Sequence, residues 1–356
     1  MSKIETLWYT RCPVPTPLGI AAQRGWIDDE FKKDGIRVQT LQDTLDPEVR
    51  ESHFDHRLDN SFRQGGNIPA IWARAAGRDT RVIGLTWTDE AQVILTLPKS
   101  GIRSLADLKQ RKLGVLTNPA SSIDFWQATT LRAYSVALRL VGLDEQAVEL
   151  IELPRPEPRG TAPRQRGWAS ERDLRESPEV AALLDGRVDA IFHKGSRGLE
   201  VADAIGAEVV FDIGKHPDPK VRINNGSPRT LTVDAKLLEQ NLDLAVRLVE
   251  RVLLAGQWAA DHPREALEYV AKETGSSEAA VERAYGADVG QHLRTDLEPS
   301  SIEALSDFKD FLFSRGFLKG DFDARAWIDP RPLALARKAA ALKPQLAQAA
   351  VEARAL

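Results

Sequence analysis

The stretch SLADLKQRKLGV, residues 104–115, gives the most information about the fold of this chain. Ser104 can cap a one-turn helix over the Leu-Ala-Asp-Leu segment, and that helix leads directly into a strand that begins near Leu113. On both sides of it, short β-branched or apolar runs alternate with helical patterns, which is typical of mostly parallel sheets with crossover helices. We therefore take this stretch as the crossing from one lobe into a second.

The patterns outside this stretch predict the content of each lobe. The strands expected in the first lobe are Ile4–Tyr9, Ile36–Leu41, Arg81–Thr86 and Gln92–Leu97, and those in the second are Leu113–Leu116, Val148–Leu153, Ala190–His193 and Val209–Asp212. Helices are expected near Asp124–Val141, Pro178–Leu184, Leu242–Asp261, Arg264–Glu273, Glu278–Tyr285 and Ile302–Ser314. The predicted domains are residues 1–100 with 222–330 (first lobe), 101–221 (second lobe) and 331–356 (a peripheral helix or tail).

Composition excludes several classes of protein. Of the 356 residues, 42% are hydrophobic and 28% are charged, which is typical of a soluble globular chain with two lobes. The net charge of −4 is spread along the chain, so we expect no nucleic-acid partner. A single cysteine excludes an internal disulfide, and with no zinc-ligand spacing we expect no metal and no organic cofactor. The first residues lack the pattern of an export signal and no apolar run is long enough to span a membrane, so the predicted location is cytoplasmic, without membrane insertion.

One segment, residues 154–176, interrupts the alternation of strands and helices because it is rich in proline and arginine. Such a composition buries little apolar surface, so we expect a long loop. Two interpretations stay open: a solvated insertion, or a lid that brings arginines toward an anion in the cleft.

Cys12 is the first candidate for chemistry. It ends the first strand pattern, within YTRCPVP, residues 9–15. The carboxyl end of a strand is where open α/β folds place ligands, and a helix that begins near Pro17 would direct its N–H groups at the sulfur. A helix N-terminus and a nearby cation both favour a thiolate. The alternative is an inert thiol that packs as a small apolar side chain.

Two segments downstream could complete a site around this thiol. His53 would be the acid, base or orienting group that thiolate chemistry needs, and Arg63 could hold an oxyanion with a bidentate fork. The pair Gly65-Gly66 permits a tight turn with positive φ, whose N–H groups would face an anion, and Asn67 would cap the helix that follows. Taken singly, the histidine could be a solvated side chain and the glycines only a turn.

The second lobe offers weaker candidates for binding. Ser121 and Ser122 precede a long helix and could form a second anion site at its N-terminus. Trp126 could provide an apolar wall for a ring, or could simply pack in the core. His193 ends a predicted strand, and we expect it to face the cleft.

These residues resemble a known family. Residues 104–115 resemble the start of the second lobe in periplasmic-binding-protein-like folds of the sulfonate, nitrate and taurine kind. The segments YTRCPVP (9–15), His53-Phe54 and FRQGGNIP (62–69) resemble the 2'-hydroxybiphenyl-2-sulfinate desulfinase family. The resemblance implies a two-lobed type II periplasmic-binding-protein-like α/β fold, with mixed, mostly parallel sheets and a helical C-terminal extension. This chain departs from the family at Thr10, where the family has serine, and in the segment after His53.

The resemblance also implies an activity, namely hydrolysis of the carbon–sulfur bond of an organic sulfinate, with an aryl group expected, and release of sulfite. Cys12, His53 and Arg63 would be catalytic, Thr10 and the Gly65-Gly66 amides would bind substrate, and no cofactor is implied. Two other functions stay open: a solute-binding protein that carries a sulfonate or related oxyanion to an ABC transporter, and a cytosolic sensor or enzyme for another anion. A missing export signal favours the enzyme over the carrier.

Overall fold

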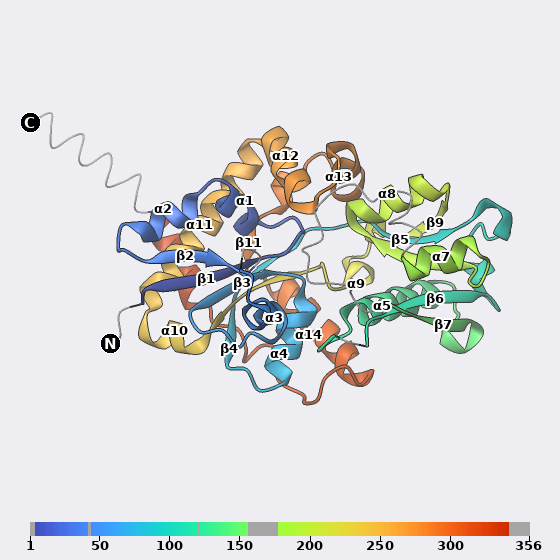
Figure 1. Cartoon of the computed structure of the whole chain (residues 1–356), viewed down its shortest axis with the longest axis horizontal. Coiled ribbons are helices and arrows are strands. Elements are labelled where there is room, and N and C mark those ends of the chain that lie inside the picture. Colours follow the sequence, from blue (N-terminus) through green and yellow to red (C-terminus); the bar gives the residue numbers. More distant parts are fainter. Residues whose placement is uncertain (1–3, 42–43, 120, 156–176, 342–356) are drawn as a thin grey trace, which may run out of the picture.

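Two mixed β-sheets form the framework of the molecule (Figure 1). The structure is a computed structural model, and it describes residues 4–41, 44–119, 121–155 and 177–341. The first sheet has the strand order β11-β4-β10-β3-β1-β2 and the second has the order β7-β6-β8-β5-β9. The strands of the first sheet are β1 (Thr6–Arg11), β2 (Arg37–Thr40), β3 (Ser61–Gly65), β4 (Thr80–Thr86), β10 (Arg229–Asp234) and β11 (Thr295–Asp296). Those of the second are β5 (Gln92–Thr96), β6 (Lys112–Thr117), β7 (Glu149–Pro154), β8 (Ala190–Lys194) and β9 (Glu208–Asp212).

Both sheets combine parallel and antiparallel pairs. In the first sheet β1 pairs in parallel with β2 and β3, whereas β10 runs antiparallel to β3 and β4. In the second, β6 is parallel to β7 and β8, and β5 is antiparallel to β8 and β9. Every residue of β5 is buried, as expected for a strand covered on both faces. The predicted two-lobed α/β architecture with mixed sheets is confirmed. The expectation of mostly parallel sheets is wrong, because β10, β11 and β5 pair antiparallel with their neighbours.

The position of β5 corrects one prediction. We expected residues 92–97 in the first lobe, but β5 lies in the second sheet between β8 and β9. The chain therefore crosses between the sheets at residues 87–91, before the stretch 104–115. An apolar run identifies a buried strand but not its partners, which is why the pattern misplaced it. The division of the chain into domains at the residues given above stays a prediction.

Helices cover the two sheets. Around the first sheet lie α1 (Pro17–Gln23), α2 (Trp26–Lys32), α3 (Pro47–Asp55), α4 (Asn67–Ala75), α10 (Ala235–Gln240), α11 (Leu242–Asp261), α12 (Pro263–Thr274) and α14 (Pro299–Ser314). Around the second lie α5 (Phe125–Leu140), α7 (Pro178–Leu184) and α8 (Gly195–Ile205). Between them lie α9 (Pro219–Arg222) and α13 (Glu278–Tyr285), and α13 packs against α8. The short 3-10 helices are η1 (Pro98–Ser100), η2 (Leu105–Leu108), η3 (Glu145–Ala147), η4 (Ile213–Lys215) and η5 (Val289–His292).

The stretch 104–115 folds as its sequence predicts. Ser104 and Asp107 form a reciprocal capping box at η2, with the Asp107 carboxylate accepting from the Ser104 N–H at 2.9 Å. The chain then enters β6, where Leu113 and Val115 are buried. Local capping thus fixes the one-turn helix, and apolar burial fixes the strand that follows it.

The end of the described chain is helical over residues 331–341, and its Leu333 and Ala336 are buried in the core of the first lobe. The remainder of the predicted C-terminal tail, and residues 156–176 of the proline- and arginine-rich segment, lie outside the described residues. Within the described part of the chain, none of the helices combines the length and the apolar character needed to cross a membrane.

Candidate active site

Cys12, His53 and Arg63 come together at the carboxyl ends of two parallel strands. Thr10 pairs with Arg63 in the register of β1 and β3, so Cys12, one residue beyond β1, lies beside Gly65 at the end of β3. The Cys12 sulfur is 3.8 Å from Nε2 of His53, on the last turn of α3, and 3.8 Å from Nη2 of Arg63. One thiol therefore contacts both an imidazole and a guanidinium.

Thr10 orients the imidazole of His53. Its Oγ1 lies 2.6 Å from Nδ1 of His53, so the opposite ring nitrogen, Nε2, faces the sulfur of Cys12. When Nδ1 carries the proton and donates to Thr10, Nε2 offers a lone pair to the thiol. Thr10 thus acts on the ring, and it is not among the side chains that line the cavity described below.

His53 and its neighbour His56 are neutral side chains in this environment. Burial lowers the pKa of His53 well below its usual range, and the charge of Arg63 lowers it further. Burial, with the charge of Arg63, likewise lowers the pKa of His56 to about 3. The His56 ring lies 3.2 Å from the Phe54 carbonyl and 3.3 Å from Oγ1 of Thr232, pointing away from the thiol. His53 is therefore able to accept a proton near neutral pH.

Arg63 is a buried cation held by backbone oxygens. Its Nε donates to the carbonyl of His53 at 3.1 Å and its Nη1 to the carbonyl of Gly66 at 2.7 Å, which leaves Nη2 directed at Cys12. The side chain is 3% exposed, and within the described residues no carboxylate forms an ion pair with it. Burying a cation without a carboxylate costs several kcal/mol, on the order of 3–5.

Gly65 is required by the position of the thiol. A Cβ at residue 65 would lie 2.0 Å from the sulfur of Cys12 and 2.7 Å from its Cβ. At the adjacent Gly66, a Cβ would lie 2.6 Å from Oδ1 of Asn225. These glycines thus allow close approach of side chains to the backbone, rather than supplying the positive φ that we expected, since neither is among the positive-φ glycines of the described chain.

Two predictions about helix N-termini are wrong. Asn67 does not cap α4: the N-cap is Gly66, and the buried Asn67 amide donates to the carbonyls of Asn224 and Pro228 at 3.1 and 3.0 Å. The N–H groups of Asn67 and Ile68 donate to the carbonyl and the side-chain oxygen of Asn225, and the anion-binding role of the Gly65 and Gly66 N–H groups stays a prediction. Similarly, the first N–H groups of α1 are accepted by Gln64 and Thr16, not by Cys12. Side chains distant in sequence occupy both helix ends, which local patterns do not reveal.

An aromatic wall stands beside the thiol. The Phe54 ring contacts the ring of His53 edge-on at 4.8 Å and stacks with Phe125 at 6.3 Å, and Phe125 in turn lies 5.1 Å from Trp126. Phe54 comes from α3 at the first sheet, and Phe125 and Trp126 come from α5 at the second. The wall thus spans the gap between the lobes. Trp126 faces the cavity, as predicted, and Phe54 and Phe125 were not singled out from the sequence.

Cys12, His53, Arg63 and the aromatic wall line one cavity of about 420 Å³ between the sheets. Its far side is formed by a charged cluster that the sequence did not suggest. The carboxylate of Glu90 accepts from Nζ of Lys194 at 2.7 Å and from Nη2 of Arg229 at 3.1 Å. Glu90 lies on the crossing between the sheets, Lys194 ends β8 and Arg229 begins β10. The one sequence signal for this charged cluster is Lys194, a charged residue at the end of a predicted strand.

Three second-lobe candidates lie elsewhere. The Ser121 hydroxyl donates to the carbonyl of Ile123 and that of Ser122 donates to Glu51, and neither serine lines the cavity. His193 does not face the cleft: its Nε2 lies 3.5 Å from the buried carboxylate of Glu179 on α7. Successive residues of a strand point to opposite faces, so the next residue, Lys194, faces the cavity instead.

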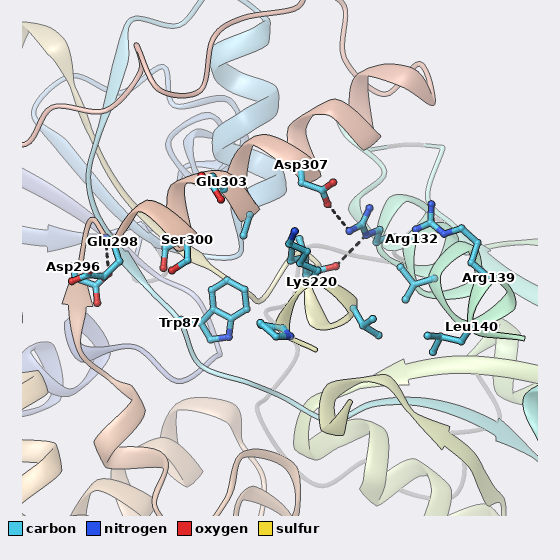
Figure 2. Close-up of a pocket in the computed structure, with 16 residues that line it drawn as sticks. Trp87, Arg132, Arg139, Leu140, Lys220, Asp296, Glu298, Ser300, Glu303 and Asp307 are labelled. Atoms are coloured by element: carbon cyan, nitrogen blue, oxygen red, sulfur yellow. Dashed lines mark hydrogen bonds and ion pairs between the residues drawn. The ribbon is translucent and has the colours of Figure 1, made fainter. Parts of the chain in front are cut away.

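A second cavity, of about 740 Å³, lies between α14 and the helices α5 and α9 (Figure 2). Arg132 of α5 crosses it and donates to the carboxylate of Asp307 on α14 at 2.6 Å, and its Nε donates to the carbonyl of Ile223 at 3.2 Å. Its guanidinium also lies 5.3 Å from the ring of Phe311. This cavity contains no cysteine or histidine. Across the described residues, no cluster of three or more His, Cys, Asp or Glu side chains could hold a metal ion.

The sequence of this chain is similar to that of two kinds of known protein. The chain is 28% identical over 353 residues to 2'-hydroxybiphenyl-2-sulfinate desulfinase from Rhodococcus erythropolis, covering 92% of each protein. It is 39% identical over 101 residues to a putative aliphatic sulfonates-binding protein from Bacillus subtilis (strain 168), covering 28% of this chain and 30% of that one. No family model matches the chain.

Solved structures of the same two kinds of protein match this chain. The crystal structure of the desulfurization enzyme DszB superimposes with a TM-score of 0.69 and 26% identity, covering 94% of this chain and 99% of that one. The periplasmic aliphatic sulphonate binding protein SsuA from Escherichia coli matches with a TM-score of 0.62 and 17% identity, covering 92% of each chain, which is a likeness of fold. Over 92% of its length, this chain is similar to 2'-hydroxybiphenyl-2-sulfinate desulfinase, and it has the fold seen in sulfonate-binding proteins.

Proposed function

We propose that this protein is a desulfinase that releases sulfite from an aryl sulfinate at Cys12. One observation carries the proposal: the sulfur of Cys12 lies 3.8 Å from both the neutral imidazole of His53 and the guanidinium of Arg63, which has no carboxylate partner among the described residues. A relative crystallised as a cysteine-to-serine mutant in complex with biphenyl-2-sulfinic acid supports the choice of substrate class. Full-length similarity to a sulfinate desulfinase supports it further.

The two ends of an aryl sulfinate match two parts of the cavity. The sulfinate is an anion with two oxygens, which the Nη2 group of Arg63 can bind with charge-assisted hydrogen bonds. The ring would lie against Phe54, Phe125 and Trp126, where apolar burial and stacking stabilise it. Binding the anion also neutralises the buried cation, so part of the cost of burying Arg63 is recovered when substrate is present.

The reaction balances as ArSO₂⁻ + H₂O → ArH + HSO₃⁻, and the site can serve it by two routes. As a general acid, the Cys12 thiol gives its proton to the ring carbon while the carbon–sulfur bond breaks and SO₂ leaves; water converts SO₂ to bisulfite, and the proton released restores the thiol. As a nucleophile, the thiolate attacks sulfur and the ring carbon leaves with the proton that His53 had removed from the thiol, which gives ArH and a Cys–S–SO₂⁻ adduct; water then hydrolyses this adduct to bisulfite and thiol.

The sulfonate-binding relatives suggest a second function, capture of a sulfonate for delivery to an ABC transporter. The charge and aromatic wall of the cavity serve a carrier as well as an enzyme. The thiol would not serve a carrier, because an anion carrier gains nothing from a cysteine held between a base and a cation. The cytoplasmic location expected from the sequence accords with the enzyme, and it stays a prediction.

Release of sulfite tests the proposal. Purified wild type is incubated with benzenesulfinate and biphenyl-2-sulfinate, beside Cys12→Ser and a matched control, Lys220→Met, at the other cavity. We expect wild type and the control to release sulfite. Cys12→Ser should release it about 1,000-fold more slowly, or not at all. No sulfite from wild type, with tight binding of an alkanesulfonate by wild type and Cys12→Ser alike, would establish a carrier.

A further inference from the structure

The charges that line the Cys12 cavity do not balance. Among the residues that the structure describes, they comprise the four cations Arg63, Lys194, Arg197 and Arg229 and the one carboxylate of Glu90. Arg63 lies at the thiol, where the sulfinate of the proposed reaction neutralises it. Lys194 and Arg229 share Glu90, and Arg197 is exposed, so a substrate with one negative charge leaves one positive charge of the Glu90 cluster unneutralised.

Glu90 is ionised and already fully engaged. Burial raises its pKa, but the charges of Lys194 and Arg229 outweigh burial and hold that pKa below its ordinary value. Both carboxylate oxygens accept from these cations, at 2.7 and 3.1 Å. A Cβ at Gly226 would lie 2.0 Å from Oε1 of Glu90, so the carboxylate is also fixed from that side. It cannot turn to neutralise a further cation.

Donors remain unused around this carboxylate. Arg229 is 0% exposed, and its Nε has no hydrogen-bond partner among the described residues. Lys194 carries three N–H donors, and Glu90 is the one partner found for it in the described part of the chain. Its side chain is 12% exposed and lines the cavity. Such donors and charge are costly to bury unless an acceptor joins them.

The start of α8 adds to this positive region. The helix begins at Gly195, directly after Lys194, whose side chain does not cap it, and the Gly195 N–H donates to the carbonyl of Ala91. Ser196 and Arg197, in its first turn, line the cavity. The positive end of the helix dipole therefore acts on the same space as the ammonium of Lys194.

We propose that the far side of the cavity binds a second anionic group, so that the substrate is an aryl sulfinate that also carries a carboxylate. The inference rests on the proposed function, in which the sulfinate occupies the Arg63 side. Lys194 would contact the carboxylate directly, with Arg197 at the rim and Arg229 beneath. The rings of Phe54, Phe125 and Trp126 line the same cavity and would hold the ring that joins the two anions.

Turnover of matched substrates tests this inference. The probes are 2-, 3- and 4-carboxybenzenesulfinate, with benzenesulfinate and the corresponding carboxamides as uncharged comparisons. For wild type we expect at least one carboxylated probe to have a kcat/KM about 10-fold or more above benzenesulfinate and its own carboxamide. Lys194→Met should reduce that ratio to about one, and Arg197→Gln should reduce it partly. Lys220→Met, outside the cavity, should leave the ratio unchanged.

Several outcomes would overturn the inference while leaving the proposed function intact: equal kcat/KM for carboxylated and uncharged probes in wild type, or a ratio unchanged in Lys194→Met. If Lys194→Met does not fold, Arg197→Gln decides. If no probe releases sulfite, the proposed function fails, and calorimetry on the Cys12→Ser protein still tests the second site. There we expect a Kd for a carboxylated probe about 10-fold below that of benzenesulfinate, and equal Kd values would refute it.

Discussion

The two cavities described above differ in how their charges are paired. In the larger one, each of the four carboxylates, Asp296, Glu298, Glu303 and Asp307, forms an ion pair with an arginine. Its two cations without such a partner in the described chain, Arg139 and Lys220, are exposed and solvated. In the smaller one Arg63 is buried beside a thiol without a carboxylate. Cavity size therefore does not identify the site, whereas an unpaired buried charge does.

Replacing Arg63 should have the largest effect. Arg63→Met removes the charge at similar volume, and we expect kcat/KM for benzenesulfinate to fall about 1,000-fold because the sulfinate loses its cation. The melting temperature should change by only a few degrees, since removing an unpaired buried charge offsets the lost hydrogen bonds. Steady-state kinetics and calorimetry of the same preparation measure both. Parallel collapse of stability and activity would mean that Arg63 is structural.

The same substitution should change the titration of His53. Burial and Arg63 hold the pKa of His53 below 6.5, so the imidazole stays neutral in wild type at that pH and gains a proton only at lower pH. Without Arg63 the pKa of His53 should rise toward 6.5. NMR titration in the Cys12→Ser background measures it, and an unchanged or lower pKa would contradict the arrangement around the thiol.

Gly65→Ala should have the next largest effect. The new Cβ would lie 2.0 Å from the sulfur, so the thiol must move away from His53 and Arg63. A displacement of about 1 Å at a reacting group costs roughly 100-fold in kcat. Gly320→Ala is the control, since its Cβ would meet only the carbonyl of Ala75, at 3.3 Å. Equal activity of the two variants would show that the position of the sulfur is not critical.

The sequence predicted the core of this site better than its surroundings. Cys12 lies one residue beyond the end of β1, and Arg63 lies in β3. Parallel pairing of β1 with β3 brings the two residues together. Glu90, Lys194 and Arg229 come from three separate segments, and no local pattern links them. His193 was chosen in place of Lys194 because a shift of one residue reverses the face of a strand. The ends of α1 and α4 were misassigned because distant side chains bind their N–H groups.

Thr10→Val should have a smaller effect. It keeps the shape of the side chain but removes the hydroxyl that lies 2.6 Å from Nδ1 of His53. With the ring less firmly oriented, kcat should fall about 10-fold with little change in KM. Thr10→Ser restores the hydroxyl and should recover most of the activity. If both variants lose activity equally, packing of the threonine, not its hydrogen bond, is what matters.

Asp307→Asn, in the larger cavity, should affect stability and not activity. It weakens the ion pair with Arg132, whose side chain is 7% exposed while that of Asp307 is 54% exposed. Because the carboxylate is half exposed, we expect a loss of about 1 kcal/mol in the free energy of unfolding. Denaturant unfolding and sulfite release measure the two properties, and a fall in kcat would show that the larger cavity takes part in turnover.

The position of a bound sulfinate tests the central claim most directly. A crystal structure of the Cys12→Ser protein with biphenyl-2-sulfinate should place the sulfinate oxygens at Arg63 and the rings against Phe54, Phe125 and Trp126. The larger cavity of Figure 2 should hold no ligand. A sulfinate bound between Arg139 and Lys220, with the Arg63 side empty, would contradict the account.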